Sequence, residues 1–381
     1  MASGSVEAFY DGRGIPVELS EVEQALDQLW GPAAEKTGGP ELDAPAVTRV
    51  VLANVVIVNL GPARPGMDET IEAITTQYPS RLIVLGTDPG AGRKLRAEVS
   101  AQCHLPAPGR PQVCSEQIIL RASVEGRDLL PAAVRSLVES DLHSVLWWCD
   151  DPREAPALFE QLAGEATRVI LDLPDPAADP AALAAAMEPK GCQTARDLAW
   201  FSLTTWRSLI ADQFDAAALG NLKRIGSIRV RSVGEVGERP TRSAAWLVAW
   251  LAGQLGWKPE GHPRSTGDGR IEASLRGQDG AVRVVLESGP SEPGALPRVA
   301  EVEIGLRPAP NAVTTLNIQC DGEGTCELCV TDDQGAGCAF PRLVKVPVAE
   351  TARRVSAALL TDRSDPPYHR ALPITLWLLG D

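Results

Sequence analysis

The residues most capable of chemistry are cysteines near the C-terminus. Cys320, Cys326, Cys329 and Cys338 lie in a Gly-rich stretch, and Cys326 and Cys329 have the spacing of a zinc knuckle. A four-cysteine zinc site needs two such pairs, whereas the other two cysteines stand singly. Acidic neighbours disfavour the thiolate form that binds zinc or attacks a disulfide. We therefore expect reduced, metal-free, packed thiols, with a zinc site or a redox dithiol as the alternatives.

The best candidates for acid–base chemistry are Asp150 and Asp151, which follow an apolar run at residues 143–149. In open α/β sheets, ligands bind beyond the carboxyl ends of strands. The alternative, which we favour, is that one aspartate caps the next helix. The Gly-rich turn at residues 86–93 lacks both GxGxxG and GxxxxGK[ST], so it is predicted to be a turn or hairpin. We expect no catalytic residue, cofactor site or metal site, and hence a protein that acts by binding.

One stretch, residues 196–215, has the residue types of a partner-binding helix. On a continuous helix its apolar side chains, Trp206 among them, form one broad arc, with Arg196, Trp200 and Arg207 together at an edge. Guanidinium groups beside an indole suit a partner surface. Alternatively, these side chains only cover the rim of the core.

A second question about this stretch is whether it is one helix. Thr204 is a candidate N-cap for a separate helix that begins at Thr205, which would split the stretch in two.

Composition narrows the function classes. The chain has 381 residues and a formal net charge of −14, so it repels phosphate backbones and is not expected to bind nucleic acid. Its longest apolar runs, residues 50–60 and 244–251, are too short to span a bilayer. The N-terminus lacks a secretory signal pattern. We expect a cytoplasmic protein that is not membrane-bound. Its nine Trp outnumber three Tyr and five Phe, so several should anchor a core or an interface.

The candidate residues described above lie on or beside predicted strands and helices, which alternate along the chain up to about residue 235. Apolar runs read as strands at residues 47–60, 80–86, 143–149, 167–172 and 223–233. Helical patterns intervene, and residues 95–103 and 112–121 read as further strands, antiparallel to the rest. This alternation predicts an α/β domain at residues 41–235 with a mainly parallel sheet flanked by helices. Residues 1–40 form a separate N-terminal helix, at 17–30, and a linker.

The pattern of residues 236–381 predicts a smaller α+β domain. A helix at 243–257 carries a stripe of Trp246, Trp250 and Trp257, which we expect in the core. A loop at 261–270 and an antiparallel meander of short strands follow. Two helices, at residues 349–360 and 366–379, close the chain.

Several segments form a specific set when they are taken together. They are residues 78–85, the Cys-Ser-Glu-Gln segment at 113–118, Leu146-Trp147-Trp148 with Asp151-Pro152, residues 168–172, and Asp197-Leu198-Ala199-Trp200 with Leu203-Thr204 and Trp206-Arg207. This set resembles a known family, the OpcA proteins or glucose-6-phosphate dehydrogenase assembly proteins, and its last part is similar to the family's DLxWxRLTPWR. The chain departs from the family pattern at Phe201-Ser202, at Thr205 in place of Pro, and at His143. The match in residues 236–381 is loose.

This resemblance implies a non-enzymatic partner that assembles or activates glucose-6-phosphate dehydrogenase for the oxidative pentose phosphate pathway. The partner-binding residues would be Arg196, Trp200, Arg207, Trp147 and Trp148. The alternatives are an α/β enzyme that acts on a phosphorylated small molecule and a zinc-containing scaffold.

Overall fold

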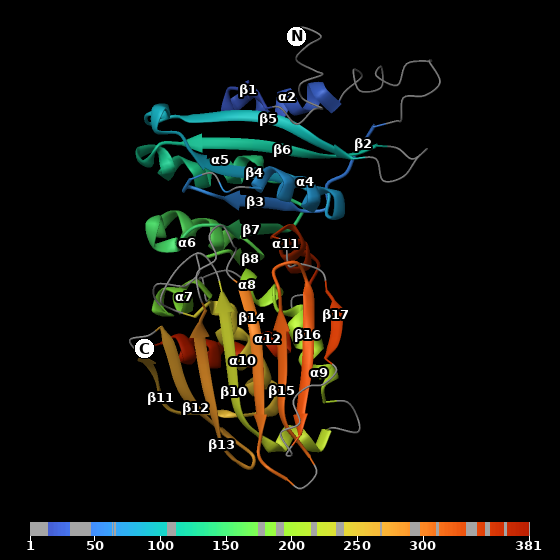
Figure 1. Ribbon diagram of the computed structural model, residues 1–381. Coiled ribbons are helices and arrows are strands. Elements are labelled where there is room, and N and C mark those ends of the chain that lie inside the picture. Colours follow the sequence, from blue (N-terminus) through green and yellow to red (C-terminus); the bar gives the residue numbers. More distant parts are fainter. Residues whose placement is uncertain are drawn as a thin grey trace, which may run out of the picture. The chain divides into compact units, whose positions relative to one another are not determined.

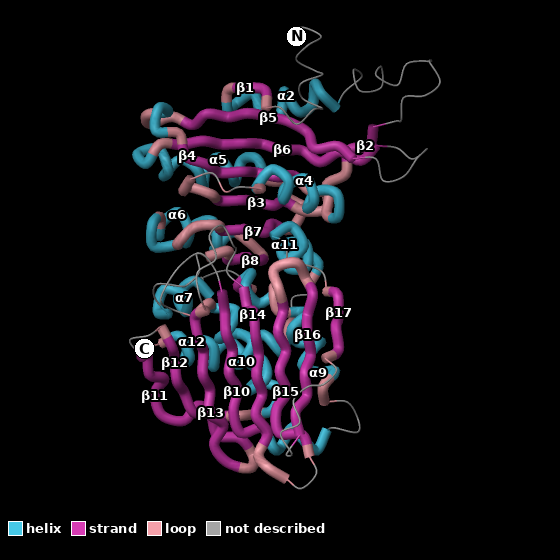
Figure 2. The backbone as a smooth tube through the Cα atoms, in the orientation of Figure 1, coloured by secondary structure: helices cyan, strands magenta, loops and turns pink. Residues whose placement is uncertain are grey.

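A computed structural model describes residues 14–30, 47–62, 64, 66–104, 112–173, 180–187, 194–214, 219–233, 240–266, 269–289, 298–309, 312–332, 341–346, 351–361 and 364–380. The chain forms two compact units (Figure 1). The first comprises residues 1–173, 186–198 and 351–360, and the second comprises residues 174–185, 199–350 and 361–381. Each unit is built around its own sheet, as the strand tracing in Figure 2 shows.

The first unit contains a nine-stranded sheet in the order β1-β5-β6-β4-β3-β7-β8-β9, with β2 paired to β6. The run from β6 through β4, β3, β7 and β8 to β9 is parallel, which confirms the predicted mainly parallel sheet. Of the two strands expected to be antiparallel to the rest, β5 is antiparallel, but β6 pairs in parallel with β4, so the expectation for residues 112–121 was wrong. The strands are β1 (Ile15–Val17), β2 (Val47–Arg49), β3 (Asn54–Val58), β4 (Arg81–Thr87), β5 (Leu95–His104), β6 (Gln112–Ala122), β7 (Ser144–Trp148), β8 (Arg168–Leu171) and β9 (Ala195–Asp197).

Helices cover this sheet because its central strands are apolar on both faces. Every residue of β3 is buried, as expected for a parallel strand covered on both sides. The helices of this unit are α2 (Val22–Trp30), α4 (Met67–Gln77), α5 (Leu130–Leu137), α6 (Pro156–Glu165) and α11 (Thr351–Leu360). Most of α7 (Pro180–Met187) belongs to the second unit. Helix α11 is far in sequence from the rest of this unit. The Arg168 guanidinium donates hydrogen bonds to two carbonyls in its last turn, those of Ala358 and Leu359.

Two predicted segments of the first unit need correction. The single strand expected at residues 47–60 is two strands, β2 and β3, that pair with different neighbours. The helix expected at residues 17–30 begins only at Val22, because residues 15–17 pair with β5 as strand β1. The predicted linker after this helix lies largely outside the described residues.

The second unit contains an eight-stranded sheet in the order β11-β12-β13-β10-β14-β15-β16-β17. Only β10 and β13 pair in parallel, so the predicted antiparallel meander is confirmed. The strands are β10 (Ile225–Val233), β11 (Lys258–Thr266), β12 (Arg270–Gly277), β13 (Gly280–Ser288), β14 (Arg298–Leu306), β15 (Val313–Cys320), β16 (Thr325–Asp332) and β17 (Arg342–Lys345). The helices are α8 (Leu198–Phe201), α9 (Thr204–Asp212), α10 (Arg242–Leu255) and α12 (Pro366–Leu379).

Two predictions about the second unit also differ from the structure. The sequence pattern places strand β10 in the domain at residues 41–235, but it lies in the middle of the second sheet between β13 and β14. The loop expected at residues 261–270 is largely strand β11, which pairs with β12 through a register shift between Glu260 and Arg264. A glycine in the left-handed region, Gly261, lies within that irregular segment and obscures the strand pattern.

The two faces of the second sheet differ in chemistry. Alternate residues such as Val282, Val284 and Leu286 are buried apolar side chains. The intervening positions carry ion pairs, among them Arg231–Glu301 at 2.7 Å and Arg270–Glu287 at 3.1 Å. This is the pattern of a sheet with one packed and one solvated face. Among the described residues, no helix is both long enough and apolar enough to cross a bilayer.

Candidate functional site

The strand order of the first unit defines one place where a ligand would be expected. Counted along the chain, the parallel run has the order 3-2-1-4-5-6, with β3 as strand 1 and β7 as strand 4. This is the order of dinucleotide-binding Rossmann sheets, in which ligands bind at the carboxyl ends of the strands where the order reverses. The corresponding crevice lies beyond Val58 and Trp148.

Side chains of the protein itself occupy that position. The Asp150 carboxylate accepts a hydrogen bond from Leu60 N at 2.5 Å, which ties the turn after β3 to the turn after β7. The Arg64 guanidinium donates to Asp172 Oδ2 at 2.7 Å and also to the carbonyl oxygen of Cys149. These contacts link the segments that follow β3, β7 and β8 at the carboxyl ends of the strands.

The turn after β3 is also poorly suited to a phosphate. A phosphate at this place would rest on the N-terminus of the following helix. Here the first turn of α4 carries Asp68 and Glu69, whose charges repel an anion. The thiol of Cys149 at the end of β7 is equally unsuited to nucleophilic chemistry, because burial and the nearby Asp172 raise its pKa well above the ordinary value.

The remaining chemical candidates of this unit have structural roles. Asp151 caps the short 3-10 helix that follows, accepting from Arg153 N at 2.9 Å. Hydrogen bonds from Arg153 lower the Asp151 pKa. The Gly-rich turn after β4 is capped in the same way, because Asp88 accepts from Gly90 N at 2.8 Å. Both assignments agree with the structural interpretations favoured from the sequence.

In the second unit, the residues of the predicted partner helix belong to an aromatic cluster. The Trp200 ring meets those of Trp246 and Tyr368 edge-on, each at 5.4 Å between centroids. Trp246 and Tyr368 stack at 4.7 Å. The Trp200 indole donates to Asp365 Oδ2 at 3.1 Å, and the other carboxylate oxygen of Asp365 caps α12 at Tyr368 N. The cluster therefore joins three helices, α8, α10 and α12.

Arg207 covers this cluster. Its guanidinium carbon lies 4.0 Å from the centroid of a Trp200 ring, in cation–π geometry. It donates to Trp200 O at 3.4 Å and to Thr204 Oγ1 at 3.1 Å. Desolvation lowers the Arg207 pKa to about 10, although Asp365 acts in the opposite direction. The group is thus a partly buried cation above an indole.

The other predicted partner-binding side chains are buried. Trp147 and Trp148 are 0% exposed, Arg196 is 1% exposed and Trp200 is 2% exposed. These four side chains therefore present almost no surface in this structure, and Arg207 is the accessible one of the five.

The placement of Trp200 at the edge of a helix was wrong because the predicted helix is not continuous. The chain forms strand β9 to Asp197, helix α8 to Phe201 and a new helix, α9, from Thr204. Ser202 and Leu203 interrupt the helical phase. The split that the sequence offered as an alternative is the observed one, but Thr204 is the first helical residue and its hydroxyl caps nothing. Trp206, expected in the core, is 8% exposed.

The expectation of reduced cysteines was also wrong. Cys320 and Cys326 form a disulfide across the hairpin of β15 and β16, with Cα atoms 4.1 Å apart. Cys329 is disulfide-bonded as well, while Cys338 lies outside the described residues. Acidic neighbours disfavour the thiolate form of a cysteine, but they do not prevent a disulfide between two cysteines that the strand register places opposite each other. No cluster of metal-ligating side chains occurs in the described part of the chain.

Similarity to known proteins extends through both units. A family model for the N-terminal domain of a glucose-6-phosphate dehydrogenase subunit matches residues 71–188. A second model, for the C-terminal domain of the same kind of protein, matches residues 193–372. These are the OpcA assembly domains.

Two curated relatives carry the name "Putative OxPP cycle protein OpcA". The one from Synechococcus elongatus is 25% identical over 274 residues, covering 68% of this chain and 57% of the relative. The one from Nostoc punctiforme is 27% identical over 211 residues, covering 53% of this chain and 43% of the relative. The chain thus spans about half the length of the curated relatives it matches.

The similarity to solved structures is distant. A dehydrogenase from Chromobacterium violaceum has 11% identity and a TM-score of 0.45, covering 86% of this chain and 94% of that one. An oxidoreductase from Sinorhizobium meliloti has 11% identity and a TM-score of 0.44, with 86% and 95% covered. No activity is transferred from such distant structures. The matches at residues 71–188 and 193–372 carry the identification, and the chain belongs to the OpcA family of glucose-6-phosphate dehydrogenase assembly proteins.

Proposed function

We propose that this protein is a non-enzymatic factor that binds glucose-6-phosphate dehydrogenase and promotes its assembly or activity in the oxidative pentose phosphate pathway. The observation that carries the proposal is the pair of family matches, which both name glucose-6-phosphate dehydrogenase and together run through most of the chain. The names of the two curated relatives point to the same pathway.

The geometry of the first unit supports the non-enzymatic part of the proposal. An enzyme with this strand order would use the crevice between β3 and β7, where Asp150, Arg64 and Asp172 make internal contacts instead. The acidic first turn of α4 adds repulsion for any phosphate at that position. A sheet of dinucleotide-binding order whose ligand position is closed is suited to a structural or binding role.

The binding surface is proposed to include Arg207. It lies half-buried over Trp200 and keeps its positive charge at neutral pH, because even its lowered pKa of about 10 is well above 7. The four buried predicted residues would act indirectly, through the cores that they help to form. Arg is enriched among the interface residues that dominate binding energy.

Steady-state kinetics of the dehydrogenase from the same organism test the proposal. Titrated protein should lower the glucose-6-phosphate concentration at half-maximal rate or raise the maximal rate, because an activator shifts the enzyme toward the conformer it binds better. The protein alone should have no activity. Unchanged kinetic constants at saturating protein would refute the activating role.

A further inference from the structure

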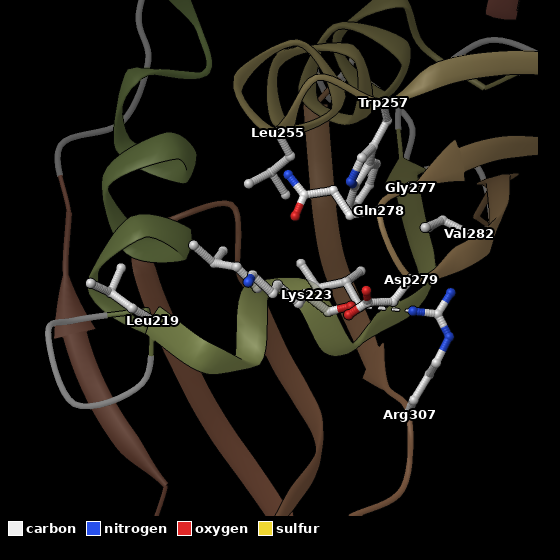
Figure 3. A pocket seen from close by; sticks show the side chains of 11 residues that line it. Leu219, Lys223, Leu255, Trp257, Gly277, Gln278, Asp279, Val282 and Arg307 are labelled. Atoms are coloured by element: carbon white, nitrogen blue, oxygen red, sulfur yellow. Dashed lines mark hydrogen bonds between the residues drawn. The ribbon is translucent and has the colours of Figure 1, made fainter.

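The second unit contains a cavity that neither the aromatic cluster nor the family match accounts for. It has a volume of about 180 Å³ and lies where the 3-10 helix Leu219–Arg224, the end of α10 and the turn between β12 and β13 meet. Figure 3 shows Leu219 and Lys223 on the helical side, with Leu255 and Trp257 above and Arg307 across the opening.

The apolar walls of the cavity suit a single ring. Leu222, Ile225, Leu255, Val282 and the Trp257 indole supply aliphatic and aromatic surface. A cavity of about 150 Å³ with such walls admits benzene, so this one has room for a six-membered ring and a short chain. Leu219 stands at the cavity with 54% of its surface exposed, so it extends the apolar wall to the opening, where a bound ring would cover it.

The cavity is firmly built. Gly256 adopts the left-handed conformation at the end of α10, and Trp257 N then bonds to Ala252 O at 2.9 Å, which fixes the indole at 5% exposure. Gly277 packs closely under the indole, since a Cβ there would lie 3.2 Å from Trp257 Nε1 and would require the ring to shift slightly. Arg307 links two walls, donating to Ala281 O at 2.7 Å and to Lys223 O at 3.3 Å.

The opening is locally basic on an acidic protein. The chain has a net charge of −14, yet Lys223 and Arg307 line this cavity against a single carboxylate, Asp279. Lys223 is exposed, and within the described ranges its ammonium group has no hydrogen bond or ion pair. A cation beside an apolar floor favours a ligand with an anionic group next to a ring.

We propose that this cavity binds a small aromatic or alicyclic monoanion, with the ring between Trp257 and Leu219 and the anionic group at Lys223. The site is separate from the proposed dehydrogenase contact at Arg207, and it does not depend on that function. The shared chemistry is a ring joined through a short chain to a carboxylate or another singly charged anionic group.

Titration of the full-length protein with 3-phenylpropionate tests this site, using isothermal calorimetry and ligand-observed saturation-transfer NMR. We expect one binding site with a dissociation constant of about 1 mM, the scale for a ligand of this size. The neutral isostere 3-phenylpropionamide should bind more weakly. Lys223→Gln should weaken binding of the anion about two- to fivefold, as for an exposed ion pair, and should leave binding of the amide unchanged.

A second variant and two matched controls separate this cavity from adventitious binding. Leu219→Ala should weaken both ligands about threefold by removing apolar contact. Lys258→Gln and Leu343→Ala alter an exposed lysine and an exposed leucine that do not line the cavity, and both should bind as the wild type does. All four side chains are exposed, so folding should be intact. The proposal is overturned by the absence of saturable binding up to about 10 mM, or by equal affinities in the cavity and control variants.

Discussion

At the scale of single residues, Trp200 is the side chain on which most of the second unit's aromatic cluster depends. It is 2% exposed, contacts two other rings and donates a hydrogen bond to Asp365. Trp200→Ala should therefore lower the free energy of unfolding by about 3–5 kcal/mol, the range for buried aromatic truncations. Trp200→Phe retains the ring contacts and should cost less. Chemical denaturation measures both, and wild-type stability of Trp200→Ala would contradict the cluster as described.

Arg207 is expected to affect binding more than stability. Arg207→Ala removes the cation over Trp200 and should weaken dehydrogenase affinity by about 2 kcal/mol if Arg207 is an interface hot spot. Arg229→Ala removes another accessible arginine of the same unit, at 53% side-chain exposure, and is the matched control. Affinities from surface plasmon resonance decide the point. Equal affinity for Arg207→Ala and the wild type would remove Arg207 from the proposed surface.

Glu301 should make the second unit sensitive to acid. Burial by itself raises the Glu301 pKa, but hydrogen bonds from Asn317 and Arg231 outweigh it and lower that pKa below 4.5. The unfolded state then binds the proton more readily, so the stabilisation is present above about pH 4.5 and is lost as pH falls through the lower folded-state pKa. Chemical denaturation at pH values between about 3 and 6 measures this effect. The free energy of unfolding should fall less steeply with decreasing pH for Glu301→Gln than for the wild type. Equal slopes for the two proteins would contradict the role of Glu301.

At the scale of elements, the β15–β16 hairpin is stapled by Cys320 and Cys326, which are six positions apart. Closing so short a loop lowers the conformational entropy of the unfolded chain, which stabilises the folded state by about 2 kcal/mol. The double variant Cys320→Ser/Cys326→Ser should lose about that much stability. Added reductant should destabilise the wild type more than the variant. Thiol titration under denaturing conditions verifies the bond, and two additional free thiols in the unreduced protein would contradict it.

Elements with strong local signals could be predicted from the sequence, and those defined by distant contacts could not. The closing helices α11 and α12 follow from apolar periodicity, and α12 begins after Asp365, a side-chain cap. The break between α8 and α9 has no Pro or Gly to mark it. Trp200, just before the break, packs against Trp246 and Tyr368 and donates a hydrogen bond to Asp365, all distant in sequence. The spacing of residues in the sequence does not reveal these partners.

The candidate sites show the same division. Asp151 as a cap was predictable, since the cue is a local Asp-Pro at a strand end. The closure of the crevice by Asp150 and Arg64 was not, because a hydrogen bond to a residue 90 positions away depends on strand order. The cavity beside Trp257 combines segments near residues 219, 257, 277 and 307, which meet only in the folded sheet.

At the scale of the whole molecule, the central claim is that the protein works by binding a dehydrogenase. Light scattering coupled to size-exclusion chromatography tests it most directly, on an equimolar mixture of the full-length protein and glucose-6-phosphate dehydrogenase from the same organism. We predict a single peak whose mass equals the sum of both proteins in a fixed ratio. Two peaks at the masses of the separate proteins, at concentrations of about 10 µM where even micromolar complexes persist, would contradict the account.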